Sequence, residues 1–440
     1  MKLSIKEIAD FCGVEAKLNG DIYKISTDSR DIDENTLFVA LIGERFDGND
    51  FVSDVLSKGA KAVVCSRYDG DDERVLLVKD TGEALLKIAN GYRKKFNIPF
   101  IALTGSVGKT TSKGMVYSVV SQKYNTLRTA GNLNNEIGVP KTLFCLDESH
   151  QAAVIEMGMN HFDEISRLSQ TVLPDIGVIT NVGTAHIENL GSREGILKAK
   201  CEILHGMKKG SPLIINGDND MLKTVATEDY KIIKFGLEKD NDIYAENIIP
   251  QQDGSHFDVI YGNEKAKCFV PAVGMHNIYN ALCAICVGIQ LGYTLDEASK
   301  GVAAFEPEGM RQKVTEINGM TFIEDCYNAN PDSMCAALET LKTLKKERII
   351  AVLGDMLELG DYSEKAHSLV GEKSAEVGCD YVLTWFLCRK LLQKRNPKLV
   401  YYMLRWVVIM FLLLERKANI LQKMPKKAGL KQYRLPTRKS

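Results

Sequence analysis

The 440-residue sequence predicts an α/β fold made of three successive units. Short apolar runs, which are typical of buried strands, alternate along the chain with longer stretches of helical periodicity. This alternation is typical of sheets whose strands are mostly parallel. A chain of this length also exceeds what one compact core usually holds, so about three units are expected. We place them at 1–82, 83–305 and 306–440.

The first unit is expected to be small, the second to contain a mostly parallel sheet, and the third to be Rossmann-like. The strands expected in the first unit are Leu37–Leu41, Ala62–Val64 and Val75–Val78, with a helix at Asp50–Lys58. Those expected in the second unit are Phe100–Leu103, Ala152–Ile155, Ile176–Thr180 and Leu213–Ile215. Those expected in the third unit are Thr321–Ile323, Ile349–Leu353 and Tyr381–Thr384, with a helix at Asp332–Leu344.

Composition excludes several classes of protein. The charged N-terminus lacks the apolar run of an export signal. The longest apolar stretch, Trp406–Leu414, has nine residues, whereas a membrane-spanning helix needs about 20. Eleven scattered cysteines fit free thiols in a reducing compartment, and the CxxC of Cys283 and Cys286 lies in a helical apolar pattern. We therefore expect a cytoplasmic protein without stable membrane insertion, and buried helix cysteines rather than a metal or redox site.

Charge is distributed unevenly along the chain. The net charge is −1, but residues 385–440 hold 15 Lys and Arg and one acid, Glu415, and so carry +14. They also hold both tryptophans and only one of the 35 glycines. This abrupt change suggests truncation or a change of reading frame after about residue 384. The alternative is a genuine basic tail for a membrane surface or a nucleic acid. Lysines alone are weak evidence for that, and we expect no nucleic-acid partner.

A glycine-rich loop between a strand and a helix is the firmest motif. In this context backbone N–H groups at a helix N-terminus can face phosphates, a lysine adds positive charge, and a threonine can ligate Mg²⁺. The spacing G-x-x-G-K-T is two residues shorter than the general phosphate loop, so an ordinary strand–helix turn is the alternative. The residues expected to bind a nucleotide are Thr104, Gly105, Ser106, Val107, Gly108, Lys109, Thr110 and Thr111.

Two further candidates follow the ends of other strands, where ligand sites of such sheets lie. Glu156 follows Ala152–Ile155 and is placed to hold Mg²⁺. A solvated acid at a strand end would show the same pattern. His186 follows Ile176–Thr180 and is a candidate ligand for a metal or a phosphate, although a lone histidine is more often structural.

Lys200 is predicted to face inward from the next helix, expected at Arg193–Met207. The residues that share its stripe are Ile196, Ile203 and Met207. Lys198 lies roughly 200° away around the helix and can face water. An inward lysine near a nucleotide is either a charge partner or a chemically modified residue. The alternative is a lysine whose stem packs while its head reaches solvent.

Segments rich in amides supply the remaining candidates. Asn134 and Asn135 lie in a segment that by itself indicates a loop and a helix cap. Asn277 and Asn280 share one face at a helix start and suit hydrogen bonds to a base or a carboxylate. Arg311 precedes the third unit and could reach a phosphate across a domain gap. Polar residues that follow a strand of the third unit are Asp325, Asn328 and Asn330.

Taken together, these segments resemble the Mur ligases, which build the peptide stem of peptidoglycan. The strings that carry the resemblance are TGSVGKTT, GNLNNEIGVP, EMGMN, TNVGTAHIENLGS, GMHNIYNA, YNANPDSM and LGDMLELG. Several independent strings in one order argue against chance. The similarity runs from about residue 25 to about 384, after which the family pattern stops. It is closest to the member that adds D-alanyl-D-alanine to UDP-N-acetylmuramoyl-tripeptide.

The resemblance implies an ATP site with two Mg²⁺ ions in the central unit. It places Lys109 and Thr110 on the phosphates, and Glu156 and His186 on Mg²⁺. Lys200 matches the lysine that the family carbamylates, and a carbamate would hold the second Mg²⁺. Thr110 would also ligate Mg²⁺. The catalytic residues that the resemblance implies are Lys109, His186, Lys200 and Arg311.

The resemblance also implies where the base and the other substrates bind. Asn277, with Asn280 beside it, would lie at the adenine, Asp325 at the ribose and Arg311 at the γ-phosphate. Residues implied at the uridine diphosphate of the first unit are Ser29, Arg30 and Gly43. Residues expected at the substrates from the other two units are Asn134, Asn135, Asn328 and Asn330.

The implied chemistry is transfer of the ATP γ-phosphoryl group to the terminal carboxylate of the tripeptide. The resulting acyl phosphate is attacked by the amine of D-alanyl-D-alanine, and domain closure would bring the two substrates together. We expect a monomer. Three alternatives remain open: a kinase-like phosphotransferase, another Mur-type amino-acid ligase, and a non-catalytic remnant that binds ATP and UDP-muramoyl peptide. The last would follow from the aberrant C-terminus.

Overall fold

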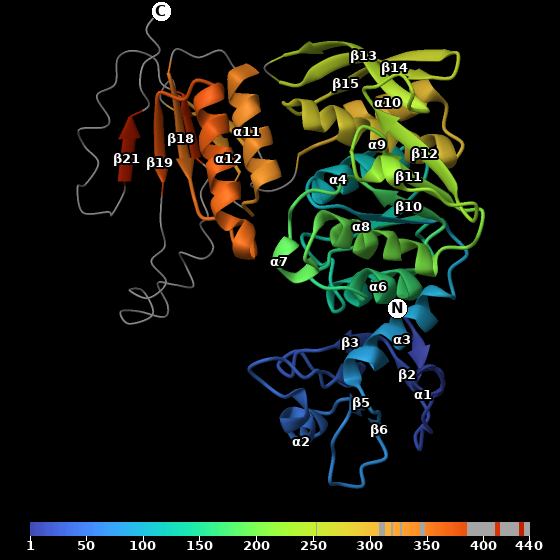
Figure 1. Ribbon diagram of the computed structural model, residues 1–440. Helices are drawn as coiled ribbons and strands as arrows, with labels where there is room; N and C mark the ends of the chain where they lie inside the picture. The colour runs from blue at the N-terminus through green and yellow to red at the C-terminus, as the bar shows by residue number, and fades with distance from the viewer. Residues whose placement is uncertain are drawn as a thin grey trace, which may run out of the picture.

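The computed structural model describes residues 1–251, 253–307, 313–317, 320–325, 328–343, 348–384, 410–413 and 431–434. Figure 1 shows three parts, with the first unit in blue below the green and yellow central unit and the third unit in orange beside it. Each part contains its own sheet, as the sequence predicts. No helix in the described part of the chain is long and apolar enough to span a membrane.

The first unit contains a four-stranded parallel sheet in the order β3-β4-β5-β6. Its strands are β3 (Lys24–Ser26), β4 (Thr36–Val39), β5 (Ala62–Cys65) and β6 (Val75–Leu77), with β1 (Leu3–Ser4) and β2 (Asp21–Ile22) in a separate pair. Its helices are α1 (Ile5–Cys12), η1 (Gly48–Phe51) and α2 (Val52–Ser57). A capping box starts α1, because Ser4 and Glu7 exchange backbone and side-chain hydrogen bonds. The three expected strands are confirmed to within two residues.

The central sheet has nine strands in the order β15-β14-β13-β12-β11-β10-β7-β9-β8. These are β7 (Phe100–Thr104), β8 (Thr126–Arg128), β9 (Ala152–Glu156), β10 (Ile176–Ile179), β11 (Pro212–Asn216), β12 (Lys231–Gly236), β13 (Ile243–Pro250), β14 (Ser255–Tyr261) and β15 (Glu264–Val270). All neighbours from β8 to β13 run parallel, which confirms the predicted mostly parallel sheet, while β14 and β15 add an antiparallel edge.

Helices cover both faces of this sheet. On one face lie α4 (Lys109–Val120), α9 (Met275–Gln290) and α10 (Leu295–Ala303); on the other lie α3 (Thr81–Arg93), α5 (Gly138–Leu143), α6 (Glu164–Val172) and α8 (Arg193–Cys201). Short connecting helices are α7 (Ile187–Leu190), η2 (Glu202–Gly206) and η3 (Leu222–Thr224).

Side chains of β7 alternate between the two apolar cores, as a buried strand requires, with Phe100 in one and Ile101 in the other. The prediction of a single helix at Arg193–Met207 is wrong at its C-terminal end. The α-helix ends at Cys201, and the chain continues as the 3-10 turn η2.

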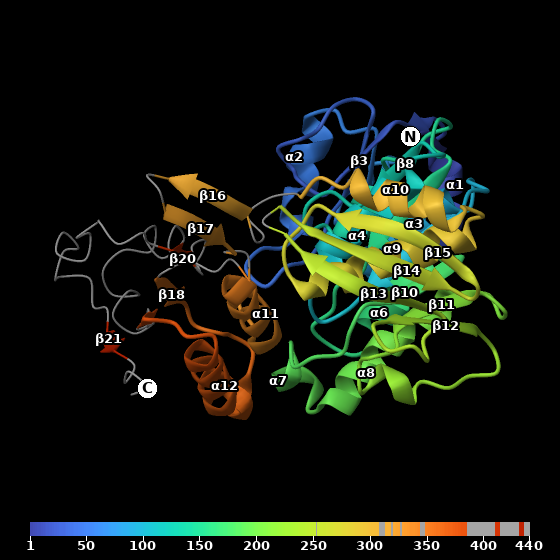
Figure 2. The ribbon, with the colours of Figure 1, turned by 90° about the horizontal axis from the view of Figure 1, so that it is seen from above.

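The third unit has a six-stranded sheet in the order β16-β17-β20-β18-β19-β21. Its elements are β16 (Lys313–Ile317), β17 (Met320–Glu324), α11 (Pro331–Thr343), β18 (Ile349–Leu353), η4 (Gly360–Tyr362), α12 (Ser363–Glu376), β19 (Tyr381–Thr384), β20 (Met410–Leu413) and β21 (Lys431–Arg434). Strands β18 and β19 are parallel, and the other pairs are antiparallel. Figures 1 and 2 place α11 and α12 between this sheet and the central unit.

The predicted change of reading frame concerns residues 385–440. Of these, only the backbones of β20 and β21 belong to the described residues, and the rest of the segment lies outside them. The backbone of β20 pairs with both β17 and β18. The change of frame stays a prediction.

Candidate active site

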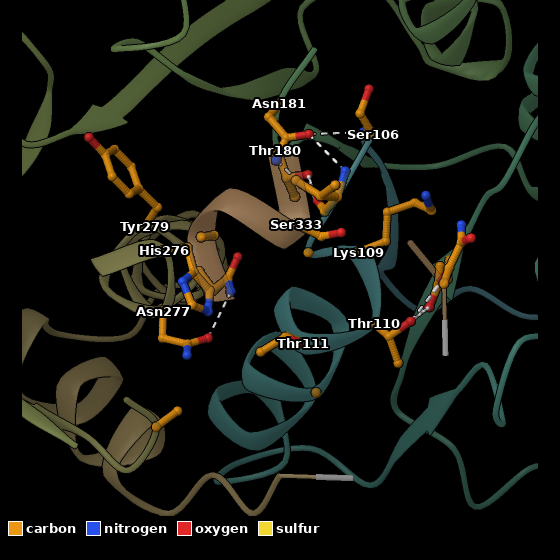
Figure 3. Close-up of a pocket in the computed structure, with 18 of the residues that line it drawn as sticks. Ser106, Lys109, Thr110, Thr111, Thr180, Asn181, His276, Asn277, Tyr279 and Ser333 are labelled. Carbon is orange, nitrogen blue, oxygen red and sulfur yellow. Dashed lines mark hydrogen bonds between the residues drawn. The ribbon is translucent and has the colours of Figure 1, made fainter. Parts of the chain in front are cut away.

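A cavity of about 1010 Å³ lies where the central and third units meet. Residues at the carboxyl ends of β7, β9 and β10, the starts of α4 and α9, and third-unit residues between Asp325 and Ala336 line it. This is the sheet edge at which ligands bind in α/β folds. Its volume reaches the upper end of the range for small-molecule sites, about 300–1,000 Å³. Figure 3 shows residues that line the cavity, among them Lys109, Thr110 and Thr111 of the first turn of α4.

The phosphate loop is shaped by Asn181, which follows β10. The Asn181 Oδ1 atom accepts hydrogen bonds from the N–H groups of Ser106 and Val107, each 2.9 Å long (Figure 3). At the end of the loop Gly108 has φ +76°, a conformation that favours glycine, and α4 begins at the next residue. Sequence reasoning did not select Asn181; its only signal was its position directly after a strand.

The first turn of α4 carries Lys109 and Thr110, the candidate ligands of the phosphates and of Mg²⁺. The Lys109 ammonium donates a 2.8 Å hydrogen bond to the carbonyl of Gly105 and so lies over the loop. The Thr110 hydroxyl lies 3.1 Å from Oε2 of Glu156. Loop residues that line the cavity are Ser106, Val107, Gly108, Lys109, Thr110 and Thr111. The buried hydroxyl of Thr104 has no hydrogen-bond partner in the described part of the chain.

Glu156 is buried rather than solvated, so the alternative of an ordinary strand-end acid is wrong. Its side chain is 2% exposed and forms an ion pair with Lys113, which is 0% exposed, at 3.2 Å. Lys113 Nζ also donates to the carbonyl of Gly131 at 3.0 Å, and Asn134 donates to Glu156 Oε1 at 2.8 Å. The carboxylate is thus fixed beside Thr110. Sequence reasoning missed Lys113, although its position one helical turn after Lys109 was a signal.

Lys200 faces inward, as predicted. It is 1% exposed, whereas Lys198 on the same helix is exposed. Burial, and then the nearby Lys109 cation, lower the pKa of Lys200 well below its usual value. Within the described residues no carboxylate forms an ion pair with its ammonium. The alternative that its head reaches solvent is therefore wrong.

His186 is influenced both by these cations and by a residue of the third unit. Burial lowers its pKa, Glu358 opposes this effect, and both Lys109 and Lys200 lower the pKa further. Its Nδ1 atom is 2.7 Å from Oε2 of Glu358. His186 also lines the cavity. The structure therefore places Lys109 and Lys200 close enough to His186 for their charges to act on its ring.

The start of α9 forms a second wall of the cavity (Figure 3). Asn277 and Asn280 share a face, as predicted, and Asn280 Nδ2 donates to Asn277 Oδ1 at 3.1 Å. Asn280 Oδ1 accepts from the Ser112 hydroxyl of α4 at 2.8 Å, which ties the two helices together. The Tyr279 hydroxyl donates to Asp218 at 2.9 Å, and burial raises its pKa. Tyr279 lines the cavity and was not predicted.

The third unit contributes further lining residues of the cavity. Asp325 is buried and lines the cavity, and so do Asn328 and Asn330. Asn330 is also a helix cap, since its Oδ1 accepts from the Ser333 N–H at 2.9 Å just after α11 begins. The expected γ-phosphate ligand Arg311 lies outside the described residues.

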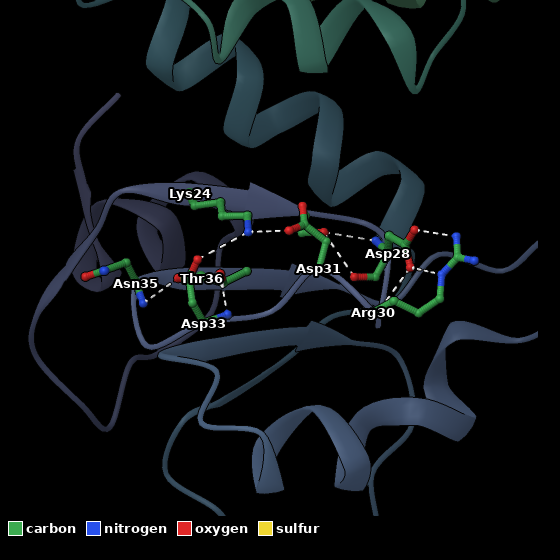
Figure 4. A network of polar contacts seen from close by, with 8 residues as sticks. Lys24, Asp28, Arg30, Asp31, Asp33, Asn35 and Thr36 are labelled. Carbon is green, nitrogen blue, oxygen red and sulfur yellow. Dashed lines mark hydrogen bonds and ion pairs between the residues drawn. The ribbon is translucent and has the colours of Figure 1, made fainter.

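The residues expected at the uridine diphosphate lie on the first unit and do not line this cavity. The Arg30 side chain is 87% exposed, and its guanidinium donates two hydrogen bonds to Asp28, of 2.8 and 2.6 Å (Figure 4). The Ser29 carbonyl accepts from Lys58 at 3.0 Å. Gly43 donates its N–H to the Phe46 carbonyl at 2.9 Å. Asn134 and Asn135, by contrast, line the cavity.

No group of three His, Cys, Asp or Glu side chains within the described ranges is arranged to hold a metal ion. A metal that arrives with a nucleotide does not require one, because Mg²⁺ typically takes one or two carboxylates, substrate phosphates and waters. The Thr110 hydroxyl beside the Glu156 carboxylate fits that donor set. Lys200 fits a second Mg²⁺ site only after a reaction that attaches an anionic, oxygen-bearing group to its amine.

The cysteines were predicted to be free and, where they form the CxxC, buried. Cys283 and Cys286 are 0% exposed and free, and burial raises the pKa of both thiols. The prediction of buried helix cysteines is confirmed.

Three family models match the chain. The Mur ligase family catalytic domain matches residues 21–93, the Mur ligase middle domain matches 103–288, and the Mur ligase glutamate ligase domain matches 310–400. Among curated proteins, the UDP-N-acetylmuramoyl-tripeptide--D-alanyl-D-alanine ligase of Bacillus subtilis is 38% identical over 369 residues, covering 83% of this chain and 80% of that protein. The enzyme of the same name from Escherichia coli is 38% identical over 364 residues, covering 82% and 80%.

Solved structures agree with these matches. MurF from Acinetobacter baumannii superimposes with a TM-score of 0.81 at 33% identity, covering 87% of this chain and 85% of that one. MurF ligase from Thermotoga maritima in complex with ADP gives a TM-score of 0.77 at 27% identity, covering 86% of each chain.

Proposed function

This chain belongs to the Mur ligase family, and we propose that it joins D-alanyl-D-alanine to UDP-N-acetylmuramoyl-tripeptide with consumption of ATP. This reaction belongs to the synthesis of peptidoglycan precursors. The observation that carries the proposal is the Glu156 carboxylate fixed 3.1 Å from the Thr110 hydroxyl at the phosphate loop. Relatives that match this chain over 80% of their own length carry this ligase name. One of the similar solved structures is a complex with ADP.

The central unit is the proposed ATP site. Backbone N–H groups of the loop and the Lys109 ammonium would bind the phosphates, because a helix N-terminus and a lysine both favour negative charge. Asn277 and Asn280 line the same cavity as the loop, and this supports their assignment to the adenine. Asp325 from the third unit would reach the ribose. The third unit therefore has to lie against the central unit for the nucleotide site to be complete.

Two Mg²⁺ ions are proposed. Thr110 and Glu156 would hold one, and His186 and a carbamylated Lys200 would hold the other. Bound Mg²⁺ supplies positive charge that offsets the negative charge gathered on the transferring phosphoryl group. The buried Lys200, whose pKa is lowered, supports carbamylation because the neutral amine is the form that reacts with CO₂. The carbamate would then place a negative charge, in place of the Lys200 ammonium, near Lys109.

The reaction proceeds in two steps. A carboxylate oxygen of the tripeptide forms a bond to the γ-phosphorus, the bond from that phosphorus to its bridging oxygen breaks, and ADP leaves. The amine of D-alanyl-D-alanine then attacks the acyl carbon, the bond to the phosphate oxygen breaks, and the amine nitrogen loses a proton. Lys109 and the loop N–H groups bind the oxygens on which negative charge develops in the first step.

The other units would bind the remaining groups. Ser29, Arg30 and Gly43 are proposed at the uridine diphosphate, and the exposed Arg30 guanidinium supports this because it can exchange Asp28 for a phosphate. Asn134 and Asn135 are proposed at the muramoyl peptide, and Asn328 and Asn330 at the incoming dipeptide.

The nine described cysteines are free thiols, which supports a cytoplasmic location. We propose a monomer.

Phosphate release with matched substrates tests the proposal. A chain whose reading frame after residue 384 is corrected should release phosphate with UDP-muramoyl-tripeptide, D-alanyl-D-alanine and ATP, and not with the dipeptide or an unrelated peptide. The chain as written should release it slowly or not at all. The substitutions that follow are made in the corrected chain. Lys109→Met should reduce the rate by about 10²–10³-fold, while the control Lys198→Met, on an exposed lysine, should not. Equal rates with dipeptide and tripeptide would favour another Mur-type amino-acid ligase.

The composition of residues 385–440 favours a second candidate function. A chain that lost the natural end of its third unit would bind ATP and UDP-muramoyl peptide without turnover. Equilibrium binding of both ligands together with no phosphate release would identify this non-catalytic form.

A further inference from the structure

His186 and Glu358 meet across the boundary between the central and third units. The His186 Nδ1 atom and the Glu358 Oε2 atom are 2.7 Å apart, although the residues are 172 positions apart in the chain. His186 precedes α7, and Glu358 lies between β18 and η4. Figure 1 shows the same approach, with α7 reaching from the central unit toward the third unit.

Both residues have unusual backbone conformations. His186 has φ +64° and Glu358 has φ +60°, and only three other non-glycine residues in the described part of the chain have positive φ. Such a conformation is unfavourable for residues that carry a Cβ and persists only where surrounding structure enforces it. Here both partners of one contact adopt it. The backbones are therefore set so that the two side chains meet.

Neighbouring contacts fix the same boundary. The Asp332 carboxylate of α11 accepts a 3.1 Å hydrogen bond from the Thr184 N–H. A Cβ on Gly183 would lie only 2.1 Å from that carboxylate, so the Asp332 side chain packs against the Gly183 backbone as closely as glycine permits. Glu358 therefore reaches His186 as part of a docked arrangement rather than as an isolated surface pair.

The contact determines which ring nitrogen is free. A carboxylate accepts hydrogen bonds only, so Nδ1 of His186 must carry the proton that it donates to Glu358. In the neutral ring Nε2 then keeps its lone pair. Nε2 has no hydrogen-bond partner within the described residues. His186 lines the cavity and is close enough to Lys109 and Lys200 for both cations to act on it.

We propose that Glu358 is a positioning residue that couples docking of the third unit to the metal-binding form of His186. In the docked arrangement its carboxylate holds the proton on Nδ1 and orients the ring, so that Nε2 is ready to ligate. A carboxylate behind a ligating histidine raises the basicity and fixes the orientation of that ligand. The inference rests on the proposed function, in which His186 is a Mg²⁺ ligand.

A weak surface ion pair is the rival explanation. The Glu358 side chain is 53% exposed, and exposed pairs contribute little to stability. The two explanations differ in metal affinity. A surface pair has no effect on it, whereas loss of an outer carboxylate of this kind typically weakens metal binding by about 10–100-fold.

The test uses the full chain, the unreactive analogue adenylyl imidodiphosphate and Mn²⁺, whose binding is followed by electron paramagnetic resonance in bicarbonate buffer. Mn²⁺ accepts the same oxygen and nitrogen ligands as Mg²⁺. Glu358→Asn is the main variant, because asparagine tolerates a positive φ but is too short to reach the ring. Glu358→Gln keeps an acceptor at the right length. Glu372→Asn, on the exposed face of α12, is the matched control.

We expect the unaltered chain to bind two Mn²⁺ ions. Glu358→Asn should weaken one of them about 10-fold or more, Glu358→Gln should weaken it less, and Glu372→Asn should leave both unchanged. Equal affinities in Glu358→Asn and Glu372→Asn would overturn the inference. Failure of the unaltered chain to bind Mn²⁺ would overturn the proposed function, and this inference with it.

Nitrogen NMR of the His186 ring gives a second measurement if Glu358→Asn unfolds. The signals are assigned with His186→Gln, and the unaltered chain should show a protonated Nδ1 and an unprotonated Nε2. Glu358→Gln should keep this form. A ring protonated on Nε2 in the unaltered chain would overturn the inference.

Discussion

Lys113 and Glu156 form a buried ion pair, with Nζ 3.2 Å from Oε2, directly beneath the turn of α4 that carries Lys109 and Thr110. Both side chains are almost inaccessible to solvent. The pair also joins three segments, because Lys113 binds the carbonyl of Gly131 and Glu156 follows β9. Lys113 thus offsets the charge of a carboxylate that would otherwise be buried alone.

Replacing Lys113 should destabilise the central unit strongly. Lys113→Met leaves the Glu156 carboxylate buried without its cation, and breaking such a pair typically costs about 3–5 kcal/mol. Lys123→Met removes a lysine that pairs with Glu297 at the surface, at 2.7 Å, and should cost about 1 kcal/mol or less. Differential scanning calorimetry compares the two variants. Equal losses of stability would contradict the assigned burial.

Labelled bicarbonate should identify the chemical state of Lys200. With ¹³C-bicarbonate the chain should show a carbamate carbon signal in NMR, because burial favours the neutral amine that reacts with CO₂. Acidification should remove the signal, since protons release CO₂ from carbamates. Lys200→Met should lose the signal and Lys198→Met should keep it. A signal that persists in Lys200→Met would assign the modification elsewhere.

Much of the site was predictable because its residues lie at strand ends and helix starts. The loop before α4 follows from its glycine motif, Glu156 from its place after β9, and the inward face of Lys200 from helical periodicity. Lys113 and Asn181 were missed because each acts on a partner that is distant in sequence, and only the fold shows that the partner is near. The contact of His186 with Glu358 spans 172 residues and has no local signal at all.

The central sheet shows the same limit. Sequence patterns predict β7, β9, β10 and β11 because these strands are continuous buried apolar runs. Strands β13 to β15 alternate buried and exposed residues, and β8 has only three residues. Short or half-exposed strands depend on their neighbours for pairing, so their own composition says little.

Gly183→Ala should disturb the docking of the third unit. Its new Cβ would lie 2.1 Å from the Asp332 carboxylate, so that side chain has to move and its hydrogen bond from the Thr184 N–H is disturbed. A displacement of about 1 Å can cost on the order of 10²-fold in rate. In a chain whose reading frame after residue 384 is corrected, kcat for phosphate release should therefore fall by at least tenfold. Gly371→Ala, with open space around its Cβ in α12, is the control and should leave kcat unchanged. An unaltered rate in Gly183→Ala would mean that docking is not required for turnover.

Acidification should remove the contribution of Glu7 to stability. The Lys95 ammonium, 2.7 Å away, and the Ser4 N–H lower the pKa of Glu7 to about 2. Because the folded-state pKa is below the unfolded one, the stabilisation is present above about pH 4.5 and is lost as pH falls toward 2. Both partners are partly exposed, so Glu7→Gln should cost about 1 kcal/mol or less at pH 7.

Thermal melting between pH 7 and pH 3 checks this dependence. The difference between the unaltered chain and Glu7→Gln should shrink as pH falls, whereas the exposed Glu15→Gln should show little difference at any pH. A constant difference over this range would contradict the assigned pKa.

Resequencing of the gene across codons 380–390 should reveal a change of reading frame. Residues 1–384 carry 41 Lys and Arg against 56 Asp and Glu, and the following 56 residues carry 15 against one. A balanced soluble domain does not change composition so abruptly within one sheet, and the natural end of the third unit would contribute part of its core. We therefore expect the chain as written to release phosphate slowly or not at all, and a chain with the corrected frame to restore turnover. An unbroken frame in independent isolates, together with ordinary enzyme rates for this chain, would contradict the prediction and make the basic tail a genuine part of the protein.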